Sequence, residues 1–552
     1  MKSKYLSLIV LSLSIVSLGG CGETTTSLST SSDDTTRSTS FDIGITSSSN
    51  ISADYDFTAP SDDIGEIYEN QSGVFYEIFV HSFCDSDGDE IGDLNGVTSK
   101  LDYLANLGVD GIWLMPISPS PSYHKYDVTN YKDVDSDYGT LEDFKNLVTS
   151  AHEKGIKVII DMVLNHTSLQ HPWFSYSYDQ ALTGSGQYKD YYNWSTTPQT
   201  GYNKYGELYY ESRFDTSMPD LNLDNEYVIE EIKDILKFWL DAGVDGFRLD
   251  AVIYYFYGNN AKNIEFLSML REYCDSIKDG VYIVGEAWTD NATITSYYES
   301  NNSYFAFGFS DSDQSGYKSA VNRRNAKDLS KGIADFTNAV RNNSDTCNPA
   351  FFISNHDQDR WARSFSGDYV SQSVKVMASL LLLSPGNPFL YYGEEIGLNG
   401  TRGSSNTDAN RRLHMIWDSL THEGETKDPV GSNYDISLQP EDGVNQQLVD
   451  KTSLLYHYKK VINLRNKYAD LFLNGSVESV ELPNLVNTCL KYSNGEETIY
   501  SLTNVGYYKA TIDLSLISSD VKISDEVRVI NETSYIEDGK LILMPYASVI
   551  LK

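Results

Sequence analysis

The stretch Gly246-Phe247-Arg248-Leu249-Asp250 is a short run of β-strand character that ends in a charged pair. Residues two apart on a strand point the same way, so Arg248 and Asp250 are expected on the same side of the strand end. Seven similar runs alternate with segments whose apolar residues recur with helical periodicity. The runs are 74–80, 111–115, 157–161, 281–286, 304–309, 350–354 and 388–392. Eight strand–helix alternations predict an α/β fold, a parallel sheet that closes as a (β/α)₈ TIM barrel.

Changes in composition divide the rest of the chain. More than sixty residues, rich in Tyr, Trp, Gly and Asn, separate the strand ending at Asp161 from the helix near residue 227. Loops of this length are uncommon, so residues 167–222 are predicted to form a subdomain inserted after the third strand. The barrel should span 66–470. Alternating apolar residues predict a C-terminal antiparallel β-sandwich domain at 471–552. These apolar residues are Ile512, Leu514, Leu516, Val527, Val529, Leu541 and Leu543.

The N-terminal residues 1–20 predict a secretion signal. Lys2 and Lys4 precede a short apolar run at 6–18, too short to span a bilayer comfortably. The following Leu18-Gly19-Gly20-Cys21 looks like a bacterial lipoprotein cleavage box. We therefore expect a lipid on Cys21 and a location on the extracellular face of a bacterial membrane. An ordinary signal peptide with a chance cysteine is the alternative.

Composition also limits the partners. The net charge of −36 repels phosphate backbones and argues against nucleic acid. Residues 21–65 are rich in Ser, Thr and Asp, and they predict a flexible tether. A monomer is expected. We expect that the fold needs no disulfide, because the remaining cysteines are scattered: Cys84, Cys274, Cys347 and Cys489.

Four predicted strands end in polar clusters, at the rim where barrel active sites lie. A single acid at a strand end is usually a helix N-cap, but four clusters at one rim indicate a site. The clusters are Asp161 with Asn165 and His166, Arg248 with Asp250, Glu286 with Trp288, and Asn355 with His356 and Asp357.

Two of these acids have different surroundings. Arg248 is expected to lower the pKa of Asp250 and keep that carboxyl ionised, as a glycosidic nucleophile requires. Glu286 ends the apolar run 281–284, and burial is expected to raise its pKa, as an acid catalyst requires. Paired carboxyl groups with divergent environments are the arrangement of glycosidases.

These clusters resemble the signature regions of the α-amylase family of glycoside hydrolases, from about residue 73 to 418. Segments 111–116, 171–174 and 391–395 support the resemblance. Segment 218–222, Met-Pro-Asp-Leu-Asn, resembles members intermediate between oligo-1,6-glucosidases and neopullulanases. The resemblance implies a retaining hydrolase that cleaves internal α-1,4 bonds of starch, amylose and malto-oligosaccharides.

The resemblance also implies residue roles. It implies that Asp250 attacks the anomeric carbon, that Glu286 protonates the leaving oxygen, and that Asp357 grips sugar hydroxyls. Arg248 then orients Asp250. The other substrate-binding residues that it implies are Tyr126, Asp161, Asn165, His166, His356, Asp408 and Arg412.

Residues 85–93 carry an acid at almost every second position. The carboxylates of such a loop can converge on one calcium ion, which prefers six to eight oxygen ligands. The segment is not an EF-hand, because Glu90 stands where Gly is needed and Gly96 where Glu is needed. It resembles the calcium loop after the first strand in oligo-1,6-glucosidase-like members. The ligands implied are Asp85, Asp87, Asp89, the carbonyl of Ile91, and Asp93. A solvated acidic turn is the alternative.

The fourth-strand signature departs from a common family pattern. Many α-amylases continue from Asp-Ala into Lys-His, and that His helps hold a calcium ion beside the inserted subdomain. Here Asp250-Ala251 continues into Val252-Ile253-Tyr254. We therefore predict one structural calcium in the first loop and none bridging the subdomain.

Three other functions compete with internal cleavage. Exo-acting α-glucosidases or oligo-1,6-glucosidases often carry Asp-Asn-Gly-Tyr where this chain has Tyr123-His124-Lys125-Tyr126, and that difference favours an open cleft. Neopullulanase-like activity is a second alternative. A non-catalytic sugar-binding lipoprotein is the third, and the intact acids at the rim argue against it.

Overall fold

The computed structural model describes residues 55–310, 316–344, 346–365, 369–404 and 406–552. The predicted signal, the lipidation residue Cys21 and most of the predicted tether lie outside these ranges. Within them, no helix is both long and apolar enough to cross a membrane.

A parallel sheet with strand order β10-β1-β2-β3-β7-β8-β9 forms the centre of the fold. Its strands are β1 (Phe75–Ile78), β2 (Gly111–Leu114), β3 (Lys157–Met162), β7 (Gly246–Leu249), β8 (Tyr282–Gly285), β9 (Ser303–Tyr304) and β10 (Phe389–Tyr391). The two edge strands of this sheet, β9 and β10, are joined through the predicted seventh strand, 350–354. Phe305, next to β9, pairs with Ala350, and Phe352 pairs with Phe389 of β10, both in parallel. The predicted (β/α)₈ barrel is confirmed.

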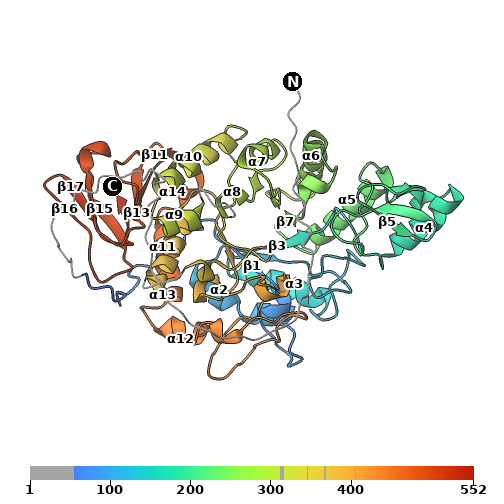
Figure 1. Cartoon of the computed structure of the whole chain (residues 1–552), viewed down its shortest axis with the longest axis horizontal. Coiled ribbons are helices and arrows are strands. Elements are labelled where there is room, and N and C mark those ends of the chain that lie inside the picture. Colours follow the sequence, from blue (N-terminus) through green and yellow to red (C-terminus); the bar gives the residue numbers. More distant parts are fainter. Residues whose placement is uncertain (1–54, 311–315, 345, 366–368, 405) are drawn as a thin grey trace, which may run out of the picture. The chain divides into compact units, whose positions relative to one another are not determined.

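Helices alternate with these strands and cover them on the outside (Figure 1). In α3, Thr140 and Asp143 form a capping box, and Leu147 and Ala151 are buried one helical turn apart. The helices of the barrel and its flanks are α1 (Leu94–Ser99), α2 (Leu101–Leu107), α3 (Leu141–Glu153), α5 (Glu226–Asp241), α6 (Asn260–Ile277), α7 (Asn291–Tyr297), α8 (Phe307–Ser310), α9 (Tyr317–Arg323), α10 (Lys327–Arg341), α11 (Val370–Leu382), α12 (Val444–Val449), α13 (Leu454–Lys467) and α14 (Ala469–Asn474).

One predicted strand becomes helical in its second half. In the run 304–309, only Tyr304 belongs to β9, and α8 begins at Phe307. In the helical part, the ring of Phe307 packs 5.1 Å from that of Phe352. A short, wholly apolar run does not distinguish a strand from a buried helical turn.

The segment inserted after β3 contains α4 (Pro172–Thr183) and a small antiparallel sheet. Its strands β4 (Trp194–Ser195), β5 (Tyr202–Tyr205) and β6 (Leu208–Glu211) are ordered β4-β6-β5. Phe174 lies at the centre of its aromatic packing, with ring centroids 5.0–5.3 Å from those of Tyr192, Trp194, Tyr205 and Tyr210.

The C-terminal part forms two antiparallel sheets, β11-β12-β13-β18-β15 and β14-β17-β16. Residues from both sheets share one core, including Leu502 and Val549 from the first and Ile512 and Leu541 from the second. Leu514 and Leu516 do not extend a strand as expected; they lie in a 3₁₀ turn that Asp513 caps. The strands are β11 (Ser476–Ser479), β12 (Asn487–Ser493), β13 (Thr498–Asn504), β14 (Ala510–Asp513), β15 (Ile523–Val527), β16 (Tyr535–Glu537), β17 (Lys540–Leu543) and β18 (Ser548–Leu551).

Residues 55–65, which the sequence assigned to the tether, contact the folded body. Asp62 pairs with Arg528, and the ring of Phe57 lies 5.1 Å from that of Tyr369. In the described structure this stretch of the predicted tether is therefore packed on the folded body.

Candidate active site

Arg248 lies at the centre of a cluster of three carboxyl groups at the barrel rim. Its Nη1 is 2.8 Å from Asp161 Oδ1 and 2.7 Å from Asp250 Oδ1, and its Nη2 is 2.9 Å from Glu286 Oε2. The guanidinium is 1% exposed. One rigid fork of donors thus orients acids from three adjacent strands, β3, β7 and β8.

The local backbone explains how these side chains meet. A Cβ on Gly246 would lie 1.7 Å from the carbonyl oxygen of Tyr282, so β7 can approach β8 this closely only with glycine there. Directly after Asp250, Ala251 adopts a left-handed conformation with φ +50°. Its N–H then donates to Glu286 Oε2 at 2.9 Å.

The two candidate catalytic acids have raised pKa values. Burial raises the pKa of Asp250 to about 6, against the opposing effect of Arg248. Burial also raises the pKa of Glu286 to about 7. Arg248 lowers the pKa of Asp250 as expected, but burial, together with the neighbouring carboxylates of Asp161 and Asp357, outweighs the guanidinium, so the net pKa is raised and not lowered. At neutral pH Asp250 is still mainly ionised, while Glu286 is partly protonated.

Asp357 shows the opposite behaviour. Burial by itself raises its pKa, but His356 and Arg412 bring the pKa well below its ordinary value. His356 Nε2 lies 3.1 Å from Asp357 Oδ2, and Arg412 Nη2 donates to Asp357 Oδ1 at 2.9 Å. Asp357 is thus an ionised acceptor whose side chain remains 32% exposed.

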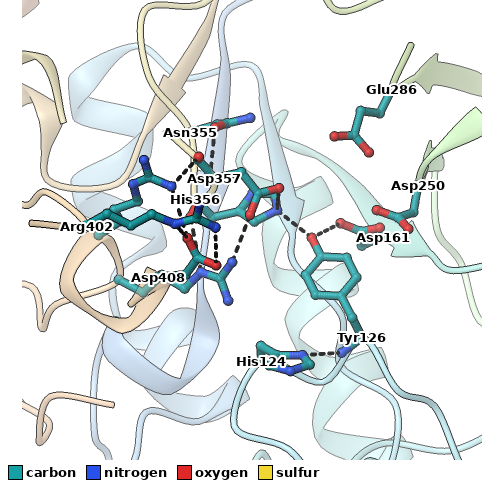
Figure 2. Close-up of polar contacts among 12 residues, drawn as sticks. His124, Tyr126, Asp161, Asp250, Glu286, Asn355, His356, Asp357, Arg402 and Asp408 are labelled. Atoms are coloured by element: carbon teal, nitrogen blue, oxygen red, sulfur yellow. Dashed lines mark hydrogen bonds and ion pairs between the residues drawn. The ribbon is translucent and has the colours of Figure 1, made fainter. Parts of the chain in front are cut away.

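These residues surround a cavity of about 500 Å³. Figure 2 shows Asp161, Asp250 and Glu286 on one side and Asp357, Arg402 and Asp408 on the other. The predicted residues that line the cavity are Tyr126, His166, Asp250, Glu286, Asp357, Asp408 and Arg412.

Four predicted residues are buried around this cavity without lining it: Asp161, Asn165, Arg248 and His356. Asn165 donates to Asp220 at 3.1 Å. The hydroxyl of Tyr126 donates to Asp161 and lies 2.8 Å from His356 Nε2 (Figure 2). The geometry gives these four residues a supporting position behind the cavity wall.

A second cavity of about 780 Å³ continues from the first, and the two share Trp288, Asp357 and Arg402 as lining residues. Trp288 is 39% exposed, and its ring stacks on Phe307 at 4.8 Å. The barrel mouth is therefore an extended cleft with an aromatic surface at the junction of its two parts.

Sequence reasoning missed several residues of the site. Asp408 is held by Arg402 at 2.8 Å and by Arg411 at 3.0 Å, and neither arginine was singled out. Glu77 in β1 is buried and lies 2.5 Å from His356. A charged residue inside the apolar run 74–80 was the available signal for Glu77.

The acidic loop before α1 fits a cation. Ligand oxygens of Asp85, Asp87 and Asp89 lie within 4.8 Å of one another. Glu90 adopts φ +74°, the left-handed conformation that glycine usually provides in such loops. Asp93 has another role: it caps α1 by accepting from Gly96 N, and it also accepts from Ser86 N and Oγ. Ile91, the fifth predicted ligand, lies in the same loop.

Four cysteines are buried and not bonded to one another: Cys84, Cys274, Cys347 and Cys489.

The fold and the site define a TIM-barrel enzyme with an acid pair suited to glycosidic-bond chemistry. Residues 77–475 match the family described as alpha amylase, catalytic domain. This match spans most of the chain, and the chain belongs to the α-amylase family of glycoside hydrolases.

Individual relatives differ in the activity that they are named for. Alpha-amylase 3 of Dictyoglomus thermophilum is 40% identical over 494 residues, covering 87% of this chain and 93% of the relative. An oligo-1,6-glucosidase of Parageobacillus thermoglucosidasius is 30% identical over 498 residues, covering 74% and 85%. The solved structure of Eubacterium rectale Amy13B superposes with a TM-score of 0.82 at 38% identity, covering 88% of this chain and 96% of that chain.

Proposed function

We propose that this glycoside hydrolase cleaves internal α-1,4-glucosidic bonds of starch, amylose and malto-oligosaccharides with retention of anomeric configuration. The observation that carries the retaining mechanism is the single Arg248 guanidinium that holds both Asp250 and Glu286. Sharing one guanidinium limits how far apart the two carboxyl groups can lie, and retaining enzymes hold theirs about 5–5.5 Å apart.

In this mechanism Glu286 donates its proton to the leaving glycosidic oxygen while Asp250 attacks the anomeric carbon. The bond to the leaving sugar breaks, and a covalent glucosyl ester forms on Asp250. Glu286, now ionised, takes a proton from water, whose oxygen displaces Asp250 and returns the α-anomer. Asp357, His166 and Tyr126 line the cavity where the reacting glucose binds.

The site also supports sugar recognition around the reacting bond. Burial lowers the pKa of His166 to about 4, so the ring is neutral at working pH. Within the described residues its buried Nε2 has no protein hydrogen-bond partner, so it is available for a sugar hydroxyl. The extended cleft past Trp288 supports binding of sugars on both sides of the cleaved bond.

End-blocked maltoheptaose, whose non-reducing end is capped, tests internal cleavage. We expect rapid cleavage with early release of several oligosaccharides, and initial products with α configuration by NMR. Glu286→Gln and Asp250→Asn should each reduce the rate by on the order of 10²-fold or more. An inert blocked substrate with glucose as the sole early product from the unblocked one would instead establish an exo-acting glucosidase. Initial β-anomer release would refute the retaining mechanism.

We also propose that Cys21 carries a lipid that anchors the enzyme at the extracellular face of a bacterial membrane. The support is the sequence Leu18-Gly19-Gly20-Cys21 after the short apolar run. Two acyl chains anchor stably, whereas one holds only marginally. The full-length chain should partition into the detergent phase, and Cys21→Ser should move it to the aqueous phase. Aqueous partitioning of both forms would refute the anchor.

A further inference from the structure

Glu77 is a buried acid behind the catalytic cavity. It lies in β1, is 2% exposed, and places Oε1 2.5 Å from Nδ1 of His356. The backbone N–H of His356 also donates to the same oxygen at 3.4 Å. Glu77 does not line the cavity, so its contact with the site runs through His356.

The other ring nitrogen of His356 faces the catalytic cavity. Nε2 lies 3.1 Å from Asp357 Oδ2 and 2.8 Å from the hydroxyl oxygen of Tyr126. The Tyr126 hydroxyl proton is donated to Asp161 at 3.0 Å, so its oxygen is left to accept from His356 (Figure 2). A neutral imidazole has one N–H and cannot donate to both Glu77 and the Tyr126 oxygen. The doubly protonated ring donates to both, and its positive charge pairs with Asp357.

The charges around His356 come from several elements. Glu77 on β1, Asp161 on β3 and Asp357 are acidic, whereas Arg248 on β7 and Arg412 are cationic. Arg412 Nε donates to the His356 carbonyl at 3.2 Å. Trp113 on β2 also packs against the ring in a T-shaped contact and carries no charge. Without Glu77, the cationic ring would lose a buried carboxylate partner while both arginines remain.

We propose that Glu77 is a positioning residue that keeps His356 doubly protonated, so that the cationic ring pairs with Asp357 and holds that carboxylate toward the bound sugar. This rests on the proposed role of Asp357 in gripping sugar hydroxyls. Glu77 then acts on the substrate indirectly, through the side chains of His356 and Asp357.

The electrostatics agree with this geometry. Burial by itself lowers the pKa of His356, but the carboxylates of Asp357 and Glu77 raise it to about 10. A cationic ring in turn contributes to the lowered pKa of Asp357. Removal of the Glu77 charge should therefore bring the titration of His356 down toward the working range of the enzyme.

Glu77→Gln tests the proposal because it keeps the shape and removes only the charge. We expect kcat/KM for maltoheptaose to fall by about 10–100-fold at pH 8, the range known for partners that orient metal-binding histidines. The loss should be smaller at acid pH, where His356 regains its second proton. The alkaline limb of the pH profile therefore shifts to lower pH. Glu77→Asp, which keeps the charge, should retain more of the wild-type profile than Glu77→Gln.

A second buried glutamate provides the matched control. Glu394 accepts from Tyr458 and Ser354 and does not contact His356. Glu394→Gln should leave the pH profile unshifted, even where it changes the melting temperature. An equal shift in both variants would overturn the specific role of Glu77.

Nitrogen-15 NMR of the imidazole rings measures the protonation state directly, with the His356 signal assigned by its loss in His356→Asn. Both ring nitrogens of His356 should be protonated in the wild-type enzyme at pH 8, and one should be unprotonated in Glu77→Gln. A neutral His356 ring in the wild-type enzyme at this pH would overturn the proposal even if Glu77→Gln does not fold. A chromogenic maltoside as substrate keeps these tests independent of whether cleavage is internal.

Discussion

At the scale of single residues, three carboxyl groups share the one guanidinium of Arg248, so the ionised site carries excess negative charge in a buried place. Such a site favours function over stability. Glu286 shows this imbalance most clearly, because its folded-state pKa is about 7 against an ordinary value of 4.5.

Glu286→Gln should therefore stabilise the enzyme in a pH-dependent way. A raised folded-state pKa means that the native state holds the proton more tightly than the unfolded state. The contribution of Glu286 to the free energy of unfolding is fully present below about pH 4.5 and is lost as the pH rises through about 7. Glutamine resembles the protonated form, so the variant should melt a few degrees above wild type at pH 8. The gain should shrink at pH 4.5. A difference in melting temperature that is the same at both pH values would contradict this account.

The residue scale also shows what could be predicted from sequence. The i, i+2 spacing on a strand correctly placed Arg248 and Asp250 together. The direction of the Asp250 pKa shift was not predictable, because it depends first on burial and then on Asp161 and Asp357, which are far away in the chain. Glu77 was missed for the same reason: nothing near it in the sequence identifies His356 as its partner.

At the scale of elements, periodicity succeeded where strands are regular and failed at their ends. All eight predicted barrel runs contain a strand or a parallel pairing, but the run 304–309 turns helical from Phe307. In the C-terminal sheets, Asp513 caps a 3₁₀ turn that ends the alternating pattern at Leu514. A side-chain cap competes with the strand ladder at such positions.

The loop 85–93 carries the prediction about metal. We propose that Asp85, Asp87 and Asp89 bind one structural calcium, because three clustered carboxylates repel one another unless a cation is shared. Calcium that binds only to the folded state stabilises it by about 4 kcal/mol at a thousandfold excess over the dissociation constant.

Chelation should lower the melting temperature of the wild-type enzyme, and Asp87→Ala should remove most of that sensitivity. Asp335→Ala, in an exposed i, i+4 pair with Lys331, is the matched control and should keep the full chelator effect. Two tightly held calcium ions per chain, or an unchanged chelator effect in Asp87→Ala, would refute the assignment.

At the scale of the whole molecule, the described chain begins with a segment that joins distant parts of the fold. Asp62 pairs with Arg528 near β15, and Asp63 pairs with Lys451, which lies between α12 and α13. The backbone N–H of Asn531 also donates to the Asp56 carbonyl. Composition alone predicted a tether here, since it does not reveal that Phe57 has an aromatic partner more than three hundred residues away.

Truncation should show which of these contacts matters. A chain that starts at residue 66 should melt several degrees below one that starts at residue 55, because it exposes the surface that Tyr55 and Phe57 cover. Exposed ion pairs contribute only about 0–1 kcal/mol each, so Phe57→Ala should reproduce more of the loss than Asp62→Ala. Turnover per folded enzyme should be unchanged, since residues 55–65 do not line the catalytic cavity. Equal melting temperatures for the two truncated chains would mean that the segment packs on the body without stabilising it.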